Sequence, residues 1–181
     1  MNQVMSKPTS EVAVEKIKIN YKGSGVAARK LTVSTVIPMD IDKAWGNVQT
    51  PELLQFVAKG MIHFKSVSEK FPKKWEVGKT YGAKMRIFGF IPFGGIHYLN
   101  ILAIDSKNHT IATKEWDSGA KVWDHEVKMK AIGTDAIHYK DTIVIYGGIL
   151  TALITAFARL FYKHRQKRWL IVAKDQLAFG R

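Results

Sequence analysis

The feature that most constrains the fold is a long, one-sided helix pattern near the C-terminal end of the chain, over residues 148–178. Large apolar side chains recur at helical spacing on one face: Leu150, Leu153, Ile154, Phe157 and Phe161. Basic side chains follow the opposite face: Arg159, Lys163, Lys167 and Lys174. A helix of this length with one apolar face needs a broad apolar surface to cover that face. The rest of the chain must supply this surface.

The middle of the chain is a run of strand patterns that can form such a surface. Seven stretches are β-prone: residues 29–37, 60–68, 77–88, 96–104, 110–117, 121–132 and 136–146. Tight turns such as Gly133-Thr134-Asp135 join several of them, so consecutive strands are expected to pair antiparallel. After the first of these strands, Asp40 and Thr50-Pro51 have the residue types that begin helices. Two short helices are therefore predicted there.

The length of the chain fits one domain with a real core, because 46% of its 181 residues are hydrophobic. We expect residues 29–181 to form that domain and residues 1–28 to be an N-terminal extension, either one extra strand or partly disordered. No secretory signal is expected, since residues 1–10 lack a basic region followed by an apolar run. Residues 142–158 carry no charge, but this run is shorter than the roughly 20 apolar residues of a membrane span.

The charge of the chain is strongly positive, with a net charge of +13, and residues 159–181 alone carry seven basic and one acidic side chain. Such a surface is either a solvated basic face or a contact for an anionic partner. The chain has no cysteine, which excludes disulfides and thiolate chemistry and fits a cytoplasmic location. No zinc-protease spacing, phosphate-binding loop or dinucleotide fingerprint is present, so neither a metal nor a cofactor is predicted. Without an accompanying module, the charge does not predict specific nucleic-acid binding.

The order of these elements resembles a known family. Residues 31–45 read LTVSTVIPMDIDKAW, residues 75–81 read WEVGKTY, and Asp141-Thr142 runs into Gly147-Gly148 where the last strand meets the helix. From about residue 29 to residue 178, the pattern is similar to the helix-grip fold of the START-related (SRPBCC) superfamily, which includes polyketide cyclase/dehydrase-like and birch-pollen-allergen-like proteins. The chain departs from it in the strongly basic tail and in lacking an obvious Gly-rich loop of the pollen-allergen type.

The resemblance implies an α+β fold, in which a curved antiparallel sheet of about seven strands wraps around the long C-terminal helix. It also implies a hydrophobic cavity between the sheet and the helix. Members of the superfamily hold lipids, sterols, hormones or polyketides in this cavity, and some of them cyclise or hydrolyse the ligand.

Strand alternation predicts a buried polar pair. In residues 121–132 the polar side chains share one face, which turns His125 inward, and the same argument turns Asp141 inward in residues 136–146. A tight turn at Gly133-Thr134-Asp135 would pair Lys128 with Lys140 and place Asp141 diagonal to His125, within side-chain reach. The carboxylate could then fix the imidazole tautomer and leave the other ring nitrogen for a ligand, as an acid or base. Alternatively, the two side chains satisfy each other and anchor the helix.

The remaining candidates form the expected cavity wall. Glu115 faces the cavity if its loop has three residues and faces solvent if the loop has two, and His97 has the same ambiguity. The predicted ligand-contacting residues are Met61, Met85, Glu115, Trp123, His125, Tyr139, Leu150, Ile154 and Phe157. These side chains could equally be ordinary core.

The sequence thus predicts binding of a hydrophobic or amphipathic small molecule or lipid, for carriage or sequestration. The alternative is a cyclase, dehydratase or hydrolase that uses His125 with Asp141. The run Lys163 to Trp169 either complements the helix dipole or contacts an anionic membrane surface through its cations and Trp169. Neither the ligand nor the oligomeric state follows from the sequence.

Overall fold

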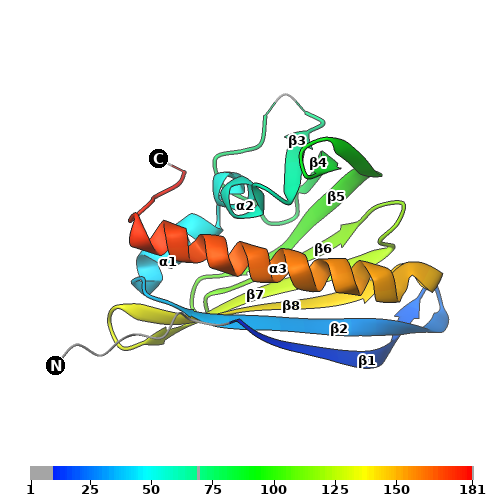
Figure 1. Ribbon diagram of the computed structural model, residues 1–181, viewed down its shortest axis with the longest axis horizontal. Coiled ribbons are helices and arrows are strands. Elements are labelled where there is room, and N and C mark those ends of the chain that lie inside the picture. Colours follow the sequence, from blue (N-terminus) through cyan, green and yellow to red (C-terminus); the bar gives the residue numbers. More distant parts are fainter. Residues whose placement is uncertain (1–9, 69, 181) are drawn as a thin grey trace.

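A computed structural model describes residues 10–68 and 70–180 and shows one curved antiparallel sheet with three helices (Figure 1). The first nine residues of the expected N-terminal extension lie outside the described residues. The strands are β1 (Glu11–Tyr21), β2 (Ser24–Ile37), β3 (Ile62–Ser66), β4 (Thr80–Ile87), β5 (Ile91–Asp105), β6 (Thr110–Trp116), β7 (Val122–Ile132) and β8 (Ala136–Tyr146). The helices are α1 (Ile41–Val48), α2 (Pro51–Ala58) and α3 (Thr151–Lys174).

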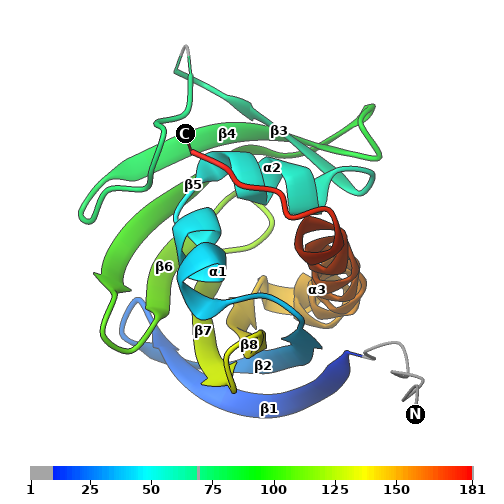
Figure 2. The same cartoon turned by 90° about the vertical axis from the view of Figure 1, so that its left-hand side faces the viewer.

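The sheet order is β1-β2-β8-β7-β6-β5-β4-β3. The sheet curls around α3, while α1 and α2 lie at one end of the curve (Figure 2). This arrangement confirms the predicted α+β fold, with eight strands where about seven were expected. The seven predicted strands are β2 to β8, and the eighth is β1, which pairs with β2 along its whole length.

The two short helices begin where their capping residues predict. The Asp40 side chain accepts hydrogen bonds from the backbone N–H groups of Asp42 and Lys43. Thr50 caps α2 by accepting from the N–H of Leu53, and Pro51 occupies the first turn. These caps satisfy N–H groups that have no partner within their helices. They reverse the chain twice in a short distance and bring β3 to the far edge of the sheet.

The predicted inward faces of β7 and β8 are confirmed. Burial alternates along the whole of β8 and along β7 as far as Lys130, with Trp123, His125, Val127 and Met129 buried on β7. On β8 the corresponding residues are fully buried: Ile137, Tyr139, Asp141, Ile143 and Ile145. The predicted pairing of Lys128 with Lys140 is also present. The short turn fixes this register, and the apolar alternation requires it.

The long helix begins slightly later and ends earlier than the sequence predicts. A single 3-10 turn (Gly148–Leu150) precedes α3, and the helix ends at Lys174 rather than near residue 178. Gly147 allows the turn to lie close to the β6–β7 loop, because a Cβ there would be 2.8 Å from the carbonyl oxygen of Gly119. Beyond α3, the chain folds back onto α1, where Asn47 Nδ2 donates to the carbonyl of Leu177.

The basic run on α3 does not lie entirely on the outer face. Trp169 is fully buried, and Arg165 and Gln166 are also buried. Arg168 Nε donates to the carbonyl oxygen of Phe56. The expectation that Trp169 could reach a membrane surface was therefore wrong, because helical periodicity turns this residue toward the sheet. Within residues 10–68 and 70–180, no helix has the length and hydropathy to cross a membrane.

Candidate functional site

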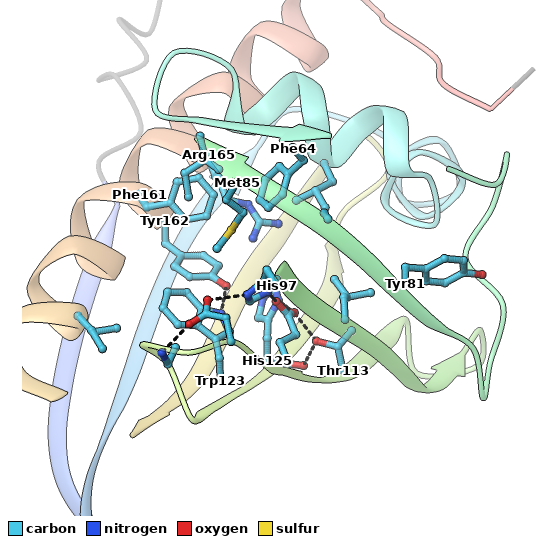
Figure 3. Close-up of a pocket in the computed structure, with 18 of the residues that line it drawn as sticks. Phe64, Tyr81, Met85, His97, Thr113, Trp123, His125, Phe161, Tyr162 and Arg165 are labelled. Atoms are coloured by element: carbon cyan, nitrogen blue, oxygen red, sulfur yellow. Dashed lines mark hydrogen bonds and ion pairs between the residues drawn. The ribbon is translucent and has the colours of Figure 1, made fainter. Parts of the chain in front are cut away.

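A cavity of about 470 Å³ lies between the first half of α3 and strands β3 to β7. Its wall is mostly apolar, and the larger contributors include Phe64, Met85, Leu99, Trp123, Phe157 and Phe161. Binding sites for small molecules have volumes of this order and combine an apolar wall with a few convergent polar groups. Figure 3 shows how four of these side chains, Phe64, Met85, Trp123 and Phe161, surround a common space. The cavity is therefore the candidate functional site.

The exposed part of the cavity wall lies near the start of α3. Three residues of the wall are exposed, and all three are at this end: Ser118 in the β6–β7 loop, Leu150 and Leu153. Gly147 lies close to this loop, because a Cβ there would be 2.8 Å from the carbonyl oxygen of Gly119.

Most of the predicted contact residues line this cavity. They are Met85, Glu115, Trp123, His125, Leu150, Ile154 and Phe157. Met61 lies just before β3 and packs against the core at the sheet edge instead. Tyr139 is fully buried against Trp169, with ring centroids 5.4 Å apart, and its side chain does not reach the cavity. Asp141 is equally buried and lies behind His125.

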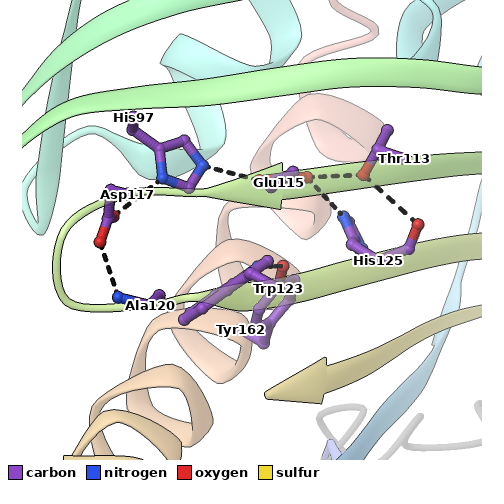
Figure 4. A network of polar contacts seen from close by, with 8 residues as sticks. All are labelled: His97, Thr113, Glu115, Asp117, Ala120, Trp123, His125 and Tyr162. Carbon is purple, nitrogen blue, oxygen red and sulfur yellow. Dashed lines mark hydrogen bonds and ion pairs between the residues drawn. The ribbon is translucent and has the colours of Figure 1, made fainter. Parts of the chain in front are cut away.

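The polar side of the cavity is a chain of alternating carboxylates and histidines (Figure 4). His97 Nδ1 lies 3.0 Å from Asp117 Oδ2, and His97 Nε2 lies 2.9 Å from Glu115 Oε2. The other oxygen of Glu115 accepts from Thr113 Oγ1 at 2.6 Å and lies 3.8 Å from His125 Nδ1. His125 Nε2 continues the chain to Asp141 Oδ1 at 2.9 Å. The structure thus places both Glu115 and His97 inward, which the sequence left open.

Asp141 ends this chain and is fully hydrogen-bonded. Its Oδ1 accepts from Tyr139 Oη at 3.1 Å as well as from His125. Its Oδ2 accepts from Gln166 Nε2, which also donates to the carbonyl of Val33. The predicted contact between His125 and Asp141 is therefore confirmed. The carboxylate joins β8, β7, β2 and α3, which supports an anchoring role for this end of the chain.

The carboxylates favour the charged form of both histidines. Burial lowers the pKa of His97, but hydrogen bonds to Asp117 and Glu115 outweigh this and raise the pKa to about 9. Burial is likewise outweighed at His125, where Asp141 and Glu115 raise the pKa above its ordinary value. Burial would raise the pKa of Glu115, but the two histidines lower it. Nε2 of His125 is engaged by Asp141, whereas its Nδ1 lies 3.8 Å from Glu115 Oε1, beyond hydrogen-bond distance, on the cavity side of the ring.

Two further polar side chains reach the cavity from α3. Tyr162 Oη accepts a hydrogen bond from Trp123 Nε1 at 3.2 Å. Burial raises the pKa of Tyr162 well above its ordinary value, so the phenol stays protonated. Arg165 lies one turn further along and also lines the cavity.

The sequence reading missed both α3 residues, and also Thr113 and Asp117. Arg165 follows Phe157 by about two helical turns and Phe161 by one, so helical spacing alone places it on the apolar face. On β6, alternation from Glu115 would have placed Thr113 and Asp117 on the same face. In the part of the chain that the structure describes, no cluster of His, Asp and Glu side chains has the arrangement of a metal site.

The fold is a START-like helix-grip fold, and comparison with solved structures supports this. A START superfamily protein from Mycobacterium smegmatis superimposes with a TM-score of 0.63 at 8% identity, over 82% of this chain and 99% of that chain. The Zhui aromatase/cyclase from Streptomyces sp. R1128 gives a TM-score of 0.62 at 9% identity, over 82% of this chain and 95% of that chain. CalU16 from Micromonospora echinospora gives a TM-score of 0.58 at 12% identity, over 98% of this chain and 81% of that chain.

These matches establish the START-like (SRPBCC) helix-grip fold that the sequence motifs predicted. No protein-family model matches the sequence, and no curated protein matches it. At such low identity, the structural neighbours define the fold alone, so the function must be argued from the cavity.

Proposed function

We propose that this protein binds a hydrophobic or amphipathic small molecule or lipid in the cavity beneath α3, for carriage or sequestration. The observation that carries the proposal is an apolar cavity of about 470 Å³, whose wall includes the exposed residues Leu150 and Leu153. A well-packed core leaves few voids larger than a water molecule, so a space of this size marks a site for a ligand. Two proteins of similar fold are described as a START superfamily member and an aromatase/cyclase, which fits a cavity-based function.

Native mass spectrometry of freshly purified protein tests this proposal directly. We expect a fraction of the protein to carry a small-molecule adduct that organic extraction then identifies. Binding of the uncharged fluorescent probe N-phenyl-1-naphthylamine gives a second measurement on protein stripped of adduct. Phe157→Ala should weaken probe binding, because Phe157 lines the cavity, whereas Leu160→Ala on the exposed face of the same helix should not. Protein with neither an adduct nor probe binding would contradict the proposal.

A second candidate function is acid–base catalysis in the same cavity, by a cyclase, dehydratase or hydrolase that uses His125 with Asp141. The chain of histidines and carboxylates on the cavity wall favours it. Because Asp141 and Glu115 raise the pKa of His125, the imidazole would act as a proton donor rather than as a base. Glu115, which lines the cavity beside His125, would orient the substrate, whereas Tyr139 is too deeply buried to do so.

The variant His125→Gln separates the two functions. A carrier should keep its probe affinity within a few-fold, while an enzyme should lose turnover by about 10²- to 10⁴-fold. The extracted molecule, incubated with wild-type protein and with the variant, shows by mass spectrometry whether a product forms. If wild-type protein leaves the molecule unchanged, the acid–base candidate is contradicted and carriage stands.

The proposal includes contact with an anionic membrane through the outer face of α3. Leu153 and Leu160 are 68% and 61% exposed there, beside the basic Arg159, Lys163 and Lys167. Exposed leucines next to cations fit a bilayer surface with anionic headgroups. We expect the protein to sediment with phosphatidylcholine vesicles only when these contain phosphatidylserine, and Leu153→Ser with Leu160→Ser to reduce the bound fraction. Equal binding to both kinds of vesicle, or to neither, would contradict this contact.

A further inference from the structure

Arg165 is a buried cation on the cavity wall. Only 7% of its surface is exposed, although it lies within the basic run of α3. Its guanidinium carbon lies 4.8 Å from the ring centroid of Tyr162 and 5.7 Å from that of Phe161. Figure 3 shows the side chain reaching from the helix into the space above Tyr162 and beside Met85. These two rings hold the planar group in place at the cavity.

The hydrogen-bonding capacity of this guanidinium is unused. Arginine has five N–H donors, and no hydrogen bond or ion pair joins those of Arg165 to another residue of the described chain; Nε is fully enclosed without a partner. A buried ion without hydrogen bonds is expensive. Ring contacts offset part of this cost. A bound group with acceptor oxygens would supply what the protein itself does not.

The carboxylates of the cavity do not fill this role. Asp117 and Glu115 are bonded to His97, and Asp141 is bonded to His125, Tyr139 and Gln166. Burial opposes the charge of Arg165, but the attraction of Asp141 at a distance outweighs it and raises the pKa of Arg165. The arginine is therefore charged and lacks close acceptors.

Tyr162 provides a neighbouring donor with a fixed position. Its oxygen accepts from Trp123 Nε1, and within residues 10–68 and 70–180 no acceptor takes the hydroxyl hydrogen. Its ring packs against the guanidinium, so both donors belong to one corner of the cavity. The rest of the wall is apolar, which suits the remainder of a ligand.

We propose that Arg165 and Tyr162 bind the carboxylate of an amphipathic ligand, whose apolar part fills the cavity. A carboxylate matches the fork of N–H groups on arginine and can accept two parallel hydrogen bonds. The inference rests on the proposed binding function and names the class of ligand: a molecule with one anionic oxygen group and an apolar body. Neutral lipids and amines of the same size are expected to bind more weakly.

Competition with N-phenyl-1-naphthylamine tests the preference. Dodecanoate, dodecanol and dodecylamine share one apolar chain and differ only in the head group. Wild-type protein should release the probe at a dodecanoate concentration about 10- to 100-fold lower than the concentration of either competitor, as charge-assisted hydrogen bonds predict. Arg165→Met should abolish this preference, so that dodecanoate and dodecanol release the probe at similar concentrations. Arg159→Met removes the same charge from the exposed face of α3 and should keep the preference.

Tyr162→Phe keeps the ring beneath the guanidinium and removes only the hydroxyl. Dodecanoate should then bind about 3- to 10-fold more weakly, and this variant provides a test even if Arg165→Met fails to fold. Equal competition by dodecanoate and dodecanol in wild-type protein would overturn the inference, as would a preference that survives Arg165→Met. Probe binding in these cases would still support the proposed function of the cavity as a binding site for apolar molecules. Absence of probe binding, with no dodecanoate adduct in native mass spectrometry, would contradict the proposed function itself.

Discussion

The two halves of α3 pack on the same sheet in different ways. The second half is closed, because Trp169, Val172 and Ala173 are buried against β7, β8 and α1 together with Tyr139. The first half covers the cavity with Ile154, Phe157 and Phe161. Aromatic rings from the helix and the sheet fill the space under the second half of α3, whereas the space under the first half is the cavity. A single helix thus combines an anchor with the cover of a cavity.

Buried charges show the same contrast. Asp141, under the closed half, accepts hydrogen bonds from three side chains. Arg165, at the boundary with the cavity, has no such partner in the described chain. Complete pairing is the mark of a structural group, since an unpaired buried charge lowers stability. The difference separates residues that hold the fold from the residue that we propose for ligand binding.

The largest expected effect comes from truncating one aromatic side chain in each half. Trp169→Ala should lower the free energy of unfolding by about 3–5 kcal/mol, because it leaves a void in a closed core. Phe157→Ala should cost less than about 1.5 kcal/mol, but it should weaken probe binding about tenfold. Urea unfolding and fluorescence titration measure the two quantities. Similar losses of stability in both variants would show that the two halves are packed alike.

Next in size is the loss of the paired carboxylate. Asp141→Asn should destabilise the protein by about 3 kcal/mol, because His125 and Gln166 lose their charged acceptor. Asp135→Asn, in the exposed β7–β8 turn, is the matched control and should change stability little. Urea unfolding at neutral pH makes the comparison. A small effect of Asp141→Asn would argue against an anchoring role.

The pH dependence of stability tests the polar wall of the cavity. The pKa of His97 is raised from 6.5 to about 9, so its contribution is complete below pH 6.5 and is lost as the pH rises through about 9. A shift of this size corresponds to about 3 kcal/mol. Unfolding free energies measured across this range should fall in wild-type protein. The decline should be much smaller in His97→Gln. If the variant shows the same decline as wild-type protein, the pH dependence comes from groups other than His97.

The smallest expected effect has the opposite sign. Arg165→Met removes a buried charge without hydrogen-bond partners and should raise stability by about 1 kcal/mol, since the new side chain is apolar. Thermal unfolding of ligand-free protein measures this change. A loss of several kcal/mol would show that Arg165 is a structural partner of Asp141, in the same class as His125.

Local sequence patterns were enough to predict the helix starts at Asp40 and Thr50 and the inward face of β8. The short turn after β7 even predicted the contact of His125 with Asp141, because one turn fixes the register of two adjacent strands. The direction of Glu115 was not predictable, since it depends on a loop of odd or even length. The loop from Asp117 to Lys121 has an odd number of residues. Glu115 therefore pairs with Trp123 and, like Trp123, faces inward.

The sequence by itself determined the α+β fold and the helix-grip order of elements, because alternation, caps and turns act between near neighbours. Only the tertiary structure decided where the cavity lies, which lysines and arginines of α3 face water, and that His97, Glu115 and His125 form one chain. These features depend on the distance and rotation of a helix relative to a sheet whose strands are far away in sequence. That geometry is set by the packing of rings such as Trp169 and Tyr139, and no local pattern specifies it.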